Sequence, residues 1–166
     1  MLSVEEARER ILSFFSVLES DDTPVLEALG QVLAEDVVAG FDIPPLANSA
    51  MDGYAVQSGS LKGASSGAPA AFSVIGSVAA GELPTDRVTP GTAVRIMTGA
   101  PIPDGADAVV PFEDTDEADR RSSGADLGRI AIRVEVEQGA DIRPAGQDVK
   151  SGERVLTKGT ALRPAE

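Results

Sequence analysis

The first twenty residues have the hydrophobic spacing of an amphipathic helix. Between residues 4 and 18, apolar side chains recur every three or four positions, which places them on one face. Ser3 and Glu6 stand three residues apart at its start, the spacing of a capping box that satisfies free backbone N–H groups. We expect a helix over residues 4–18 that buries Phe14 or Phe15, either within its own lobe or against a second copy.

The remainder of the chain is a series of short apolar runs separated by glycine and proline, a pattern typical of strands joined by turns. Residues 129–136 alternate between apolar and charged side chains, which predicts a half-buried strand, possibly at a sheet edge. By contrast, residues 114–127 are charged and have no periodicity, so we expect a solvated hairpin loop there. The other predicted strands cover residues 32–38, 72–76, 92–97, 108–110 and 153–156, and the first of these could instead be a short helix that runs into a strand.

These patterns predict an α+β fold that is mostly β. Many short strands with Gly/Pro turns favour a small β-barrel or sandwich over residues 47–140. Residues 1–46, with the helix, and residues 141–166 flank this insert and would meet across it. We therefore expect an elongated two-lobe chain, in which domain I is interrupted by the inserted domain II.

The charge and composition of the chain argue against several classes of binding partner and of catalytic chemistry. The chain has 166 residues and a net charge of −13, which argues against nucleic-acid and anionic-membrane partners because both need clustered Lys and Arg. It has no cysteine and no histidine, so disulfides, zinc sites and histidine- or thiol-based catalysis are excluded. A bound metal would be a hard cation such as Mg²⁺ on carboxylates. No apolar run approaches a membrane span and no signal-peptide pattern opens the chain, so we expect a cytoplasmic location.

Three carboxylates stand beside residues that bend the backbone: Asp52, Glu113 and Asp148. Asp52 belongs to the stretch 44–56, which opens with two prolines, contains an Asp-Gly turn and then resembles the start of a strand. Paired carboxylates could hold Mg²⁺ or act as acid and base, but each could equally be a plain turn residue. The Gly/Pro loop at residues 98–105 could direct N–H groups at an oxyanion, or could simply connect two strands.

Three motifs, in order and spacing, resemble the MoeA family of molybdopterin molybdenumtransferases, which is related to the E domain of gephyrin. The first motif is Asn-Ser-Ala-Met-Asp-Gly-Tyr-Ala at residues 48–55. The second is Arg-Ile-Met-Thr-Gly-Ala-Pro at residues 95–101, continued by matching residues up to 113, and the third is Gly-Gln-Asp at 146–148. The resemblance covers essentially the whole chain, which looks like the N-terminal part of such a protein.

The resemblance implies an enzyme that inserts molybdate into adenylylated molybdopterin (molybdopterin-AMP) with Mg²⁺, releasing AMP. It also implies an elongated homodimer whose active cleft lies between the third domain of one subunit and the first two domains of the other. The pocket-bearing third domain and the fourth domain are expected to lie outside the present chain. A lobe of charge −13 is a poor site for molybdate and phosphate anions.

Carried over by position, the motifs suggest a set of site residues. One departure is Gln147, where the family often has Glu, and we leave it out of the site. We expect the two aspartates to share one edge of the molecule, exposed and without Lys or Arg partners. The predicted catalytic residues and Mg²⁺ ligands are Asp52 and Asp148, and the predicted substrate-binding residues are Thr98, Gly99 and Glu113.

Two other functions remain open. The chain could be a non-catalytic dimerisation or scaffolding module that binds another protein, with the same fold as the enzyme fragment. A third reading is an unrelated Mg²⁺-dependent hydrolase that works through carboxylates. If the chain is a fragment of the molybdenum-insertion enzyme, we expect it to be inactive alone.

Overall fold

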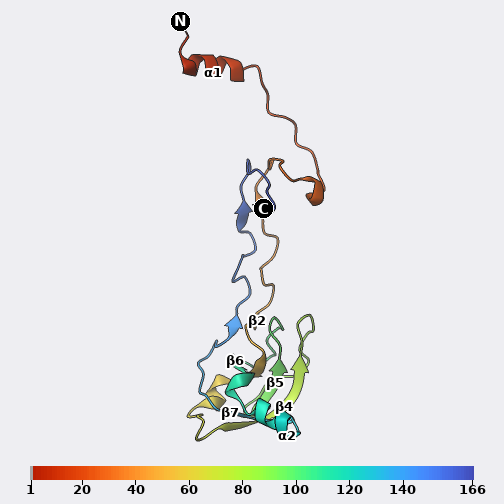
Figure 1. The fold of residues 1–166 in the computed structure, drawn as a ribbon, viewed down its shortest axis with the longest axis vertical. Coiled ribbons are helices and arrows are strands. Elements are labelled where there is room, and N and C mark those ends of the chain that lie inside the picture. Colours follow the sequence, from red (N-terminus) through yellow and green to blue (C-terminus); the bar gives the residue numbers. More distant parts are fainter. Residues whose placement is uncertain (1) are drawn as a thin grey trace. The chain divides into compact units, whose positions relative to one another are not determined.

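The computed structural model describes residues 2–166, which divide into two compact units. One unit consists of residues 2–38 together with 154–166, and the other of residues 39–153. The larger unit holds the five-stranded sheet and every candidate site residue, so it positions the site (Figure 1).

Helix α1 (Val4–Leu12) begins as the sequence predicts. The Glu6 N–H donates to Ser3 Oγ at 3.1 Å and the Ser3 N–H donates to Glu6 Oε2 at 2.8 Å, which completes the capping box. The helix ends at Leu12, six residues earlier than predicted. None of its residues is buried, and an isolated helix of this length has little to stabilise further turns.

The expected burial of Phe14 or Phe15 within its own lobe is wrong. Their exposed fractions in the single chain are 79% and 73%. Among the described residues of this unit only Ala28 is buried, so the unit has no apolar core of its own to receive them.

A short antiparallel ribbon joins the two ends of the chain in the smaller unit. Strand β1 (Val37–Val38) pairs with β9 (Arg154–Leu156), and the short 3₁₀ turn η1 (Val25–Glu27) precedes them. The predicted strand at 32–38 is therefore reduced to its last two residues. Asp36 accepts hydrogen bonds from the Lys158 N–H at 2.7 Å and from Arg154 Nη1 at 3.1 Å, which ties the ribbon together.

The larger unit is built on one curled five-stranded sheet (Figure 1). The sequence predicted either a small barrel or a sandwich and did not distinguish between them. Its strand order is β6-β3-β5-β4-β7. Only the β4–β5 pair is parallel, and the other neighbours are antiparallel. Strands form at all the predicted places in this unit, but the one expected at residues 129–136 ends at Ile132. It lies at an edge of the sheet, the position that the sequence allowed. The strands are β3 (Gly53–Val56), β4 (Ala70–Val78), β5 (Thr92–Ile96), β6 (Ala108–Pro111) and β7 (Arg129–Ile132).

Alternating side chains of this sheet form two apolar clusters. Tyr54 and Val56 belong to one cluster, whereas Ala55 between them belongs to the other, as the two-residue period of a strand requires. The first cluster also contains Ile130 from β7. Both faces of the sheet are therefore packed against apolar side chains.

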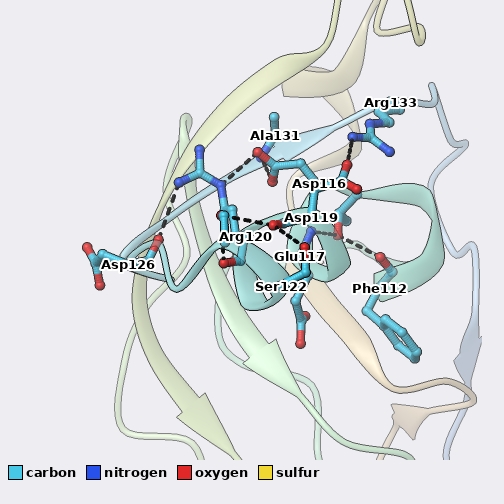
Figure 2. Close-up of polar contacts among 11 residues, drawn as sticks. Phe112, Asp116, Glu117, Asp119, Arg120, Ser122, Asp126, Ala131 and Arg133 are labelled. Carbon is cyan, nitrogen blue, oxygen red and sulfur yellow. Dashed lines mark hydrogen bonds and ion pairs between the residues drawn. The ribbon is translucent and has the colours of Figure 1, made fainter.

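The predicted hairpin loop at residues 114–127 is wrong: this segment holds η3 (Phe112–Asp114) and helix α2 (Glu117–Ser123). Figure 2 shows how α2 is fastened. Asp116 accepts from the Ala131 N–H at 2.8 Å and from Arg120 Nε at 2.7 Å. The Ala131 contact ties the start of α2 to β7 and is tertiary, so hydrophobic periodicity does not reveal the helix.

Candidate functional site

Two loops at one end of the sheet are joined by backbone hydrogen bonds. The Ser49 N–H donates to the Ala100 carbonyl at 3.0 Å, and the Gly99 N–H donates to the Ser49 carbonyl at 2.8 Å. Ser49 ends β2 (Asn48–Ser49), which pairs with β8 (Ile142–Arg143). The segments that enter and leave the sheet are therefore neighbours, as the sequence predicted.

Asp52 and Thr98 meet directly across these loops. The Thr98 N–H and the Thr98 hydroxyl both donate to Asp52 Oδ1, each at 2.7 Å. The backbone hydrogen bond from Thr98 and then its hydroxyl lower the pKa of Asp52 below its ordinary value of 3.8. Burial opposes them, and the nearby charge of Arg95 makes the smallest contribution to the lowering. Asp52 is therefore an oriented, ionised carboxylate at neutral pH, and within residues 2–166 no hydrogen bond occupies its Oδ2.

Local sequence determines how Asp52 is presented. The Ser49 hydroxyl donates to the Met51 carbonyl at 2.6 Å and accepts from the Met51 N–H at 3.2 Å, which closes a tight polar turn before Asp52. Gly53 follows and pairs with strands on both sides. A Cβ at Gly53 would lie 2.0 Å from the Val110 carbonyl oxygen, so only glycine fits there.

The other two predicted substrate-binding residues are brought near this contact by their backbones. Gly99 follows Thr98 and has a φ of +82°, a conformation that favours glycine. Glu113 is exposed in η3, and the preceding Phe112 N–H donates to the Asp52 carbonyl at 3.1 Å. The structure thus joins the segments that carry Asp52, Thr98, Gly99 and Glu113.

Asp148 has a different environment. Arg143 Nη2 contacts both of its carboxylate oxygens, at 2.9 and 2.7 Å, so the expectation of no Lys or Arg partner is wrong for this residue. The Pro/Gly turn between the two residues folds the chain back and lets their side chains meet. The Asp148 N–H donates to the Ile43 carbonyl at 2.9 Å. Asp148 therefore lies beyond one end of the β2–β8 ladder, whereas Asp52 lies beyond the other end.

These residues do not form a complete magnesium site. Among residues 2–166 there is no group of three or more Asp, Glu, His or Cys side chains placed to hold a metal ion. Asp148 forms an ion pair with Arg143, and of the two Asp52 carboxylate oxygens only Oδ2 has no hydrogen bond among residues 2–166. Mg²⁺ favours six oxygen ligands in octahedral geometry, so most ligands would have to come from substrate, water or other protein segments.

Sequence reasoning missed two arginines. Arg143 stands five residues before Asp148 across a Pro/Gly turn, a spacing that could have suggested the ion pair. Arg95 lies directly opposite Tyr54, the single tyrosine of the chain, in the β3–β5 register, and no local pattern signals that pairing.

Over residues 2–166, no helix has the length and apolar character needed to cross a bilayer.

The larger unit combines a curled mixed sheet with a carboxylate–threonine contact at its strand ends. The chain belongs to the family described as the MoeA N-terminal region (domain I and II), which matches residues 2–166. The family resemblance found in the sequence is confirmed.

Relatives and solved structures agree with this assignment. The chain is 39% identical over 165 residues to molybdopterin molybdenumtransferase 2 of Mycobacterium tuberculosis, covering 99% of this chain and 39% of that protein. It is 37% identical to a molybdopterin molybdenumtransferase of Staphylococcus aureus, covering 98% and 37%. The crystal structure of the molybdopterin biosynthesis MoeA protein from Pyrococcus horikoshii superposes with a TM-score of 0.85 at 38% identity, covering 97% of this chain and 41% of that one. The mostly β fold is confirmed, and the chain spans about two fifths of the length of these relatives.

Proposed function

We propose that this chain is the N-terminal part of a molybdopterin molybdenumtransferase that works in molybdenum cofactor biosynthesis. The observation that carries the proposal is the Asp52–Thr98 contact, built from two of the family motifs on a fold that matches along the whole chain. The proposed reaction is insertion of molybdate into molybdopterin-AMP. Domain I would comprise residues 1–46 and 141–166, and domain II residues 47–140.

In this proposal the chain contributes an oriented carboxylate rather than the anion-binding pocket. Asp52 is ionised at neutral pH and is held by Thr98, so it can accept a proton or a hydrogen bond without rearranging. The net charge of −13 disfavours binding of molybdate and phosphate by this part alone. Basic groups would come from a further domain, and the chain alone would be inactive. A direct role for Asp148, Mg²⁺ binding and a cytoplasmic location remain predictions.

A homodimer is the second part of the proposal. The segment from α1 onward exposes large apolar side chains and has no core beneath them. Such a surface is typical of an interface covered in the assembled protein. The same observation favours the alternative function, a non-catalytic dimerisation or scaffolding module. The exposed residues include Val4, Ile11, Leu12, Phe14, Phe15, Val17 and Leu18.

The test is turnover by a polypeptide that carries this chain together with the remaining family domains. Asp52→Asn keeps the shape of the side chain but removes its charge, so conversion of molybdopterin-AMP with molybdate should fall by at least about a hundredfold if the group works as a base. The matched control is Asp104→Asn, at an exposed loop aspartate of the same unit. Absence of turnover by the wild type would favour the scaffolding alternative, and full turnover by Asp52→Asn would show that this carboxylate is not needed for the reaction.

A further inference from the structure

Arg95 fastens the two strand ends from which Asp52 and Thr98 emerge. Its Nη1 donates to the Gly53 carbonyl at 3.1 Å and to the Ile96 carbonyl at 3.0 Å. Gly53 and Ile96 are partners in the β3–β5 register. Asp52 immediately precedes the first of them and Thr98 stands two residues after the second, so Arg95 clamps the last strand pair before the site.

Arg95 is itself held by a buried acid and two aromatic rings. Its Nε lies 3.0 Å from Oε2 of Glu117 as an ion pair, and its Nη2 lies 3.4 Å from Oε1. The Glu117 side chain is only 2% exposed. The guanidinium carbon lies 5.3 Å from the ring centre of Tyr54 and 5.7 Å from that of Phe112. The ion pair and the two rings surround the guanidinium, and its Nη1 reaches both carbonyls.

Stability alone is a poor explanation for this arrangement. A buried ion pair loses much of its Coulomb energy to the desolvation of both charges, and apolar replacements are often as stable. Arg121 also pairs with Glu117, through Nε at 2.8 Å, yet no hydrogen bond joins it to Gly53 or Ile96 among the described residues. Of the two arginines on this acid, only Arg95 therefore reaches the strand ends.

We propose that Arg95, oriented by Glu117, is a positioning residue that holds Asp52 in register with Thr98. The use of this contact in catalysis rests on the proposed function, but the positioning itself can be measured without turnover. The charge of Arg95 also contributes to the low pKa of Asp52, after the two hydrogen bonds from Thr98.

The experiment compares Arg95→Lys and Arg95→Gln with the control Arg121→Gln in the present chain. Carboxyl NMR measures the pKa of Asp52, and amide hydrogen exchange measures protection of the Thr98 N–H. Loss of the paired donors should speed exchange at Thr98 by about tenfold or more in both Arg95 variants, because hydrogen bonds from charged groups contribute about 1.5–3 kcal/mol. Arg95→Gln should raise the pKa of Asp52 further than Arg95→Lys, which keeps the charge, and Arg121→Gln should change neither quantity.

The variants also separate positioning from a merely structural role. If Arg95→Gln does not fold, Arg95→Lys still decides, and Glu117→Gln should reproduce its effect on Thr98 because the guanidinium loses its charged anchor. Wild-type exchange at Thr98 in folded Arg95→Lys and Glu117→Gln would overturn the proposal. In the longer polypeptide, absence of turnover by the wild type would overturn the proposed function while leaving the NMR result intact, so the two failures are distinguishable.

Discussion

Thr98 donates two hydrogen bonds to the same carboxylate oxygen of Asp52, one from its backbone N–H and one from its hydroxyl, both at 2.7 Å. The two residues are 46 positions apart and lie at the ends of paired strands. The contact occupies Oδ1 of Asp52 and leaves Oδ2 without a hydrogen bond among residues 2–166. The backbone hydrogen bond and the hydroxyl hydrogen bond from Thr98 can be tested separately.

Thr98→Val should raise the pKa of Asp52 without returning it to its ordinary value. Valine removes the hydroxyl hydrogen bond but keeps the backbone one, which is the larger cause of the low pKa. Carboxyl NMR titration measures the change, and Thr98→Ser, which keeps a hydroxyl, should behave like the wild type. An unchanged pKa in Thr98→Val would show that the hydroxyl does not hold the carboxylate in solution.

Acid should release the loop around Thr98. Because the pKa of Asp52 is lower in the folded protein than its ordinary value of 3.8, its contribution to stability is present above that value and is lost as pH falls through the lowered pKa. The Thr98 amide signal should therefore shift and lose protection only below about pH 3.8. Asp52→Asn should abolish this transition, and a transition retained in that variant would assign it to another carboxylate.

Gly53→Ala should disrupt the sheet at the site. The new Cβ would meet the backbone oxygen of Val110 at 2.0 Å, where no flexible side chain can yield. Overpacking of this kind should lower the free energy of unfolding by about 3 kcal/mol or more, as measured by urea denaturation. Gly59→Ala is the control, since a Cβ there meets no atom within 4 Å. Equal stability of the two variants would contradict the close approach.

Arg143→Gln should change the stability of the chain by less than about 1 kcal/mol, because its ion pair with Asp148 is solvent-exposed. The side chains are 40% and 50% exposed, so water and salt compete with the pair. Urea denaturation of the variant provides the measurement, and Arg154→Gln, at another exposed pair, is the comparison. A loss several times larger would mean that the pair is shielded from solvent.

Phe14→Ala should have little effect on the unfolding of the single chain, within about 0.5 kcal/mol, because the ring is exposed. If the exposed apolar segment is a dimer interface, the same substitution should weaken self-association of the longer polypeptide in sedimentation experiments. Ser16→Ala, a polar change two residues further along, should leave association unaltered. An unchanged dimer in Phe14→Ala would remove this residue from the interface.

Local patterns in the sequence were enough for much of the fold. The capping box at Ser3 and Glu6 and the strands of the larger unit follow from patterns among residues a few positions apart. Such signals depend on backbone sterics and on the two-residue period of a half-buried strand. The order of the motifs was also sufficient to recognise the family.

Only the tertiary structure decided what the candidate residues contact. Asp52 meets Thr98, while Asp148 meets Arg143, although both aspartates stand in similar Pro/Gly loops. Helix α2 forms in a segment without hydrophobic periodicity because β7 supplies its partners, and α1 ends early because its own unit offers no core. Sequence patterns record local preference and average burial, whereas these outcomes depend on which strand ends are brought together by register and on which surfaces find a neighbour.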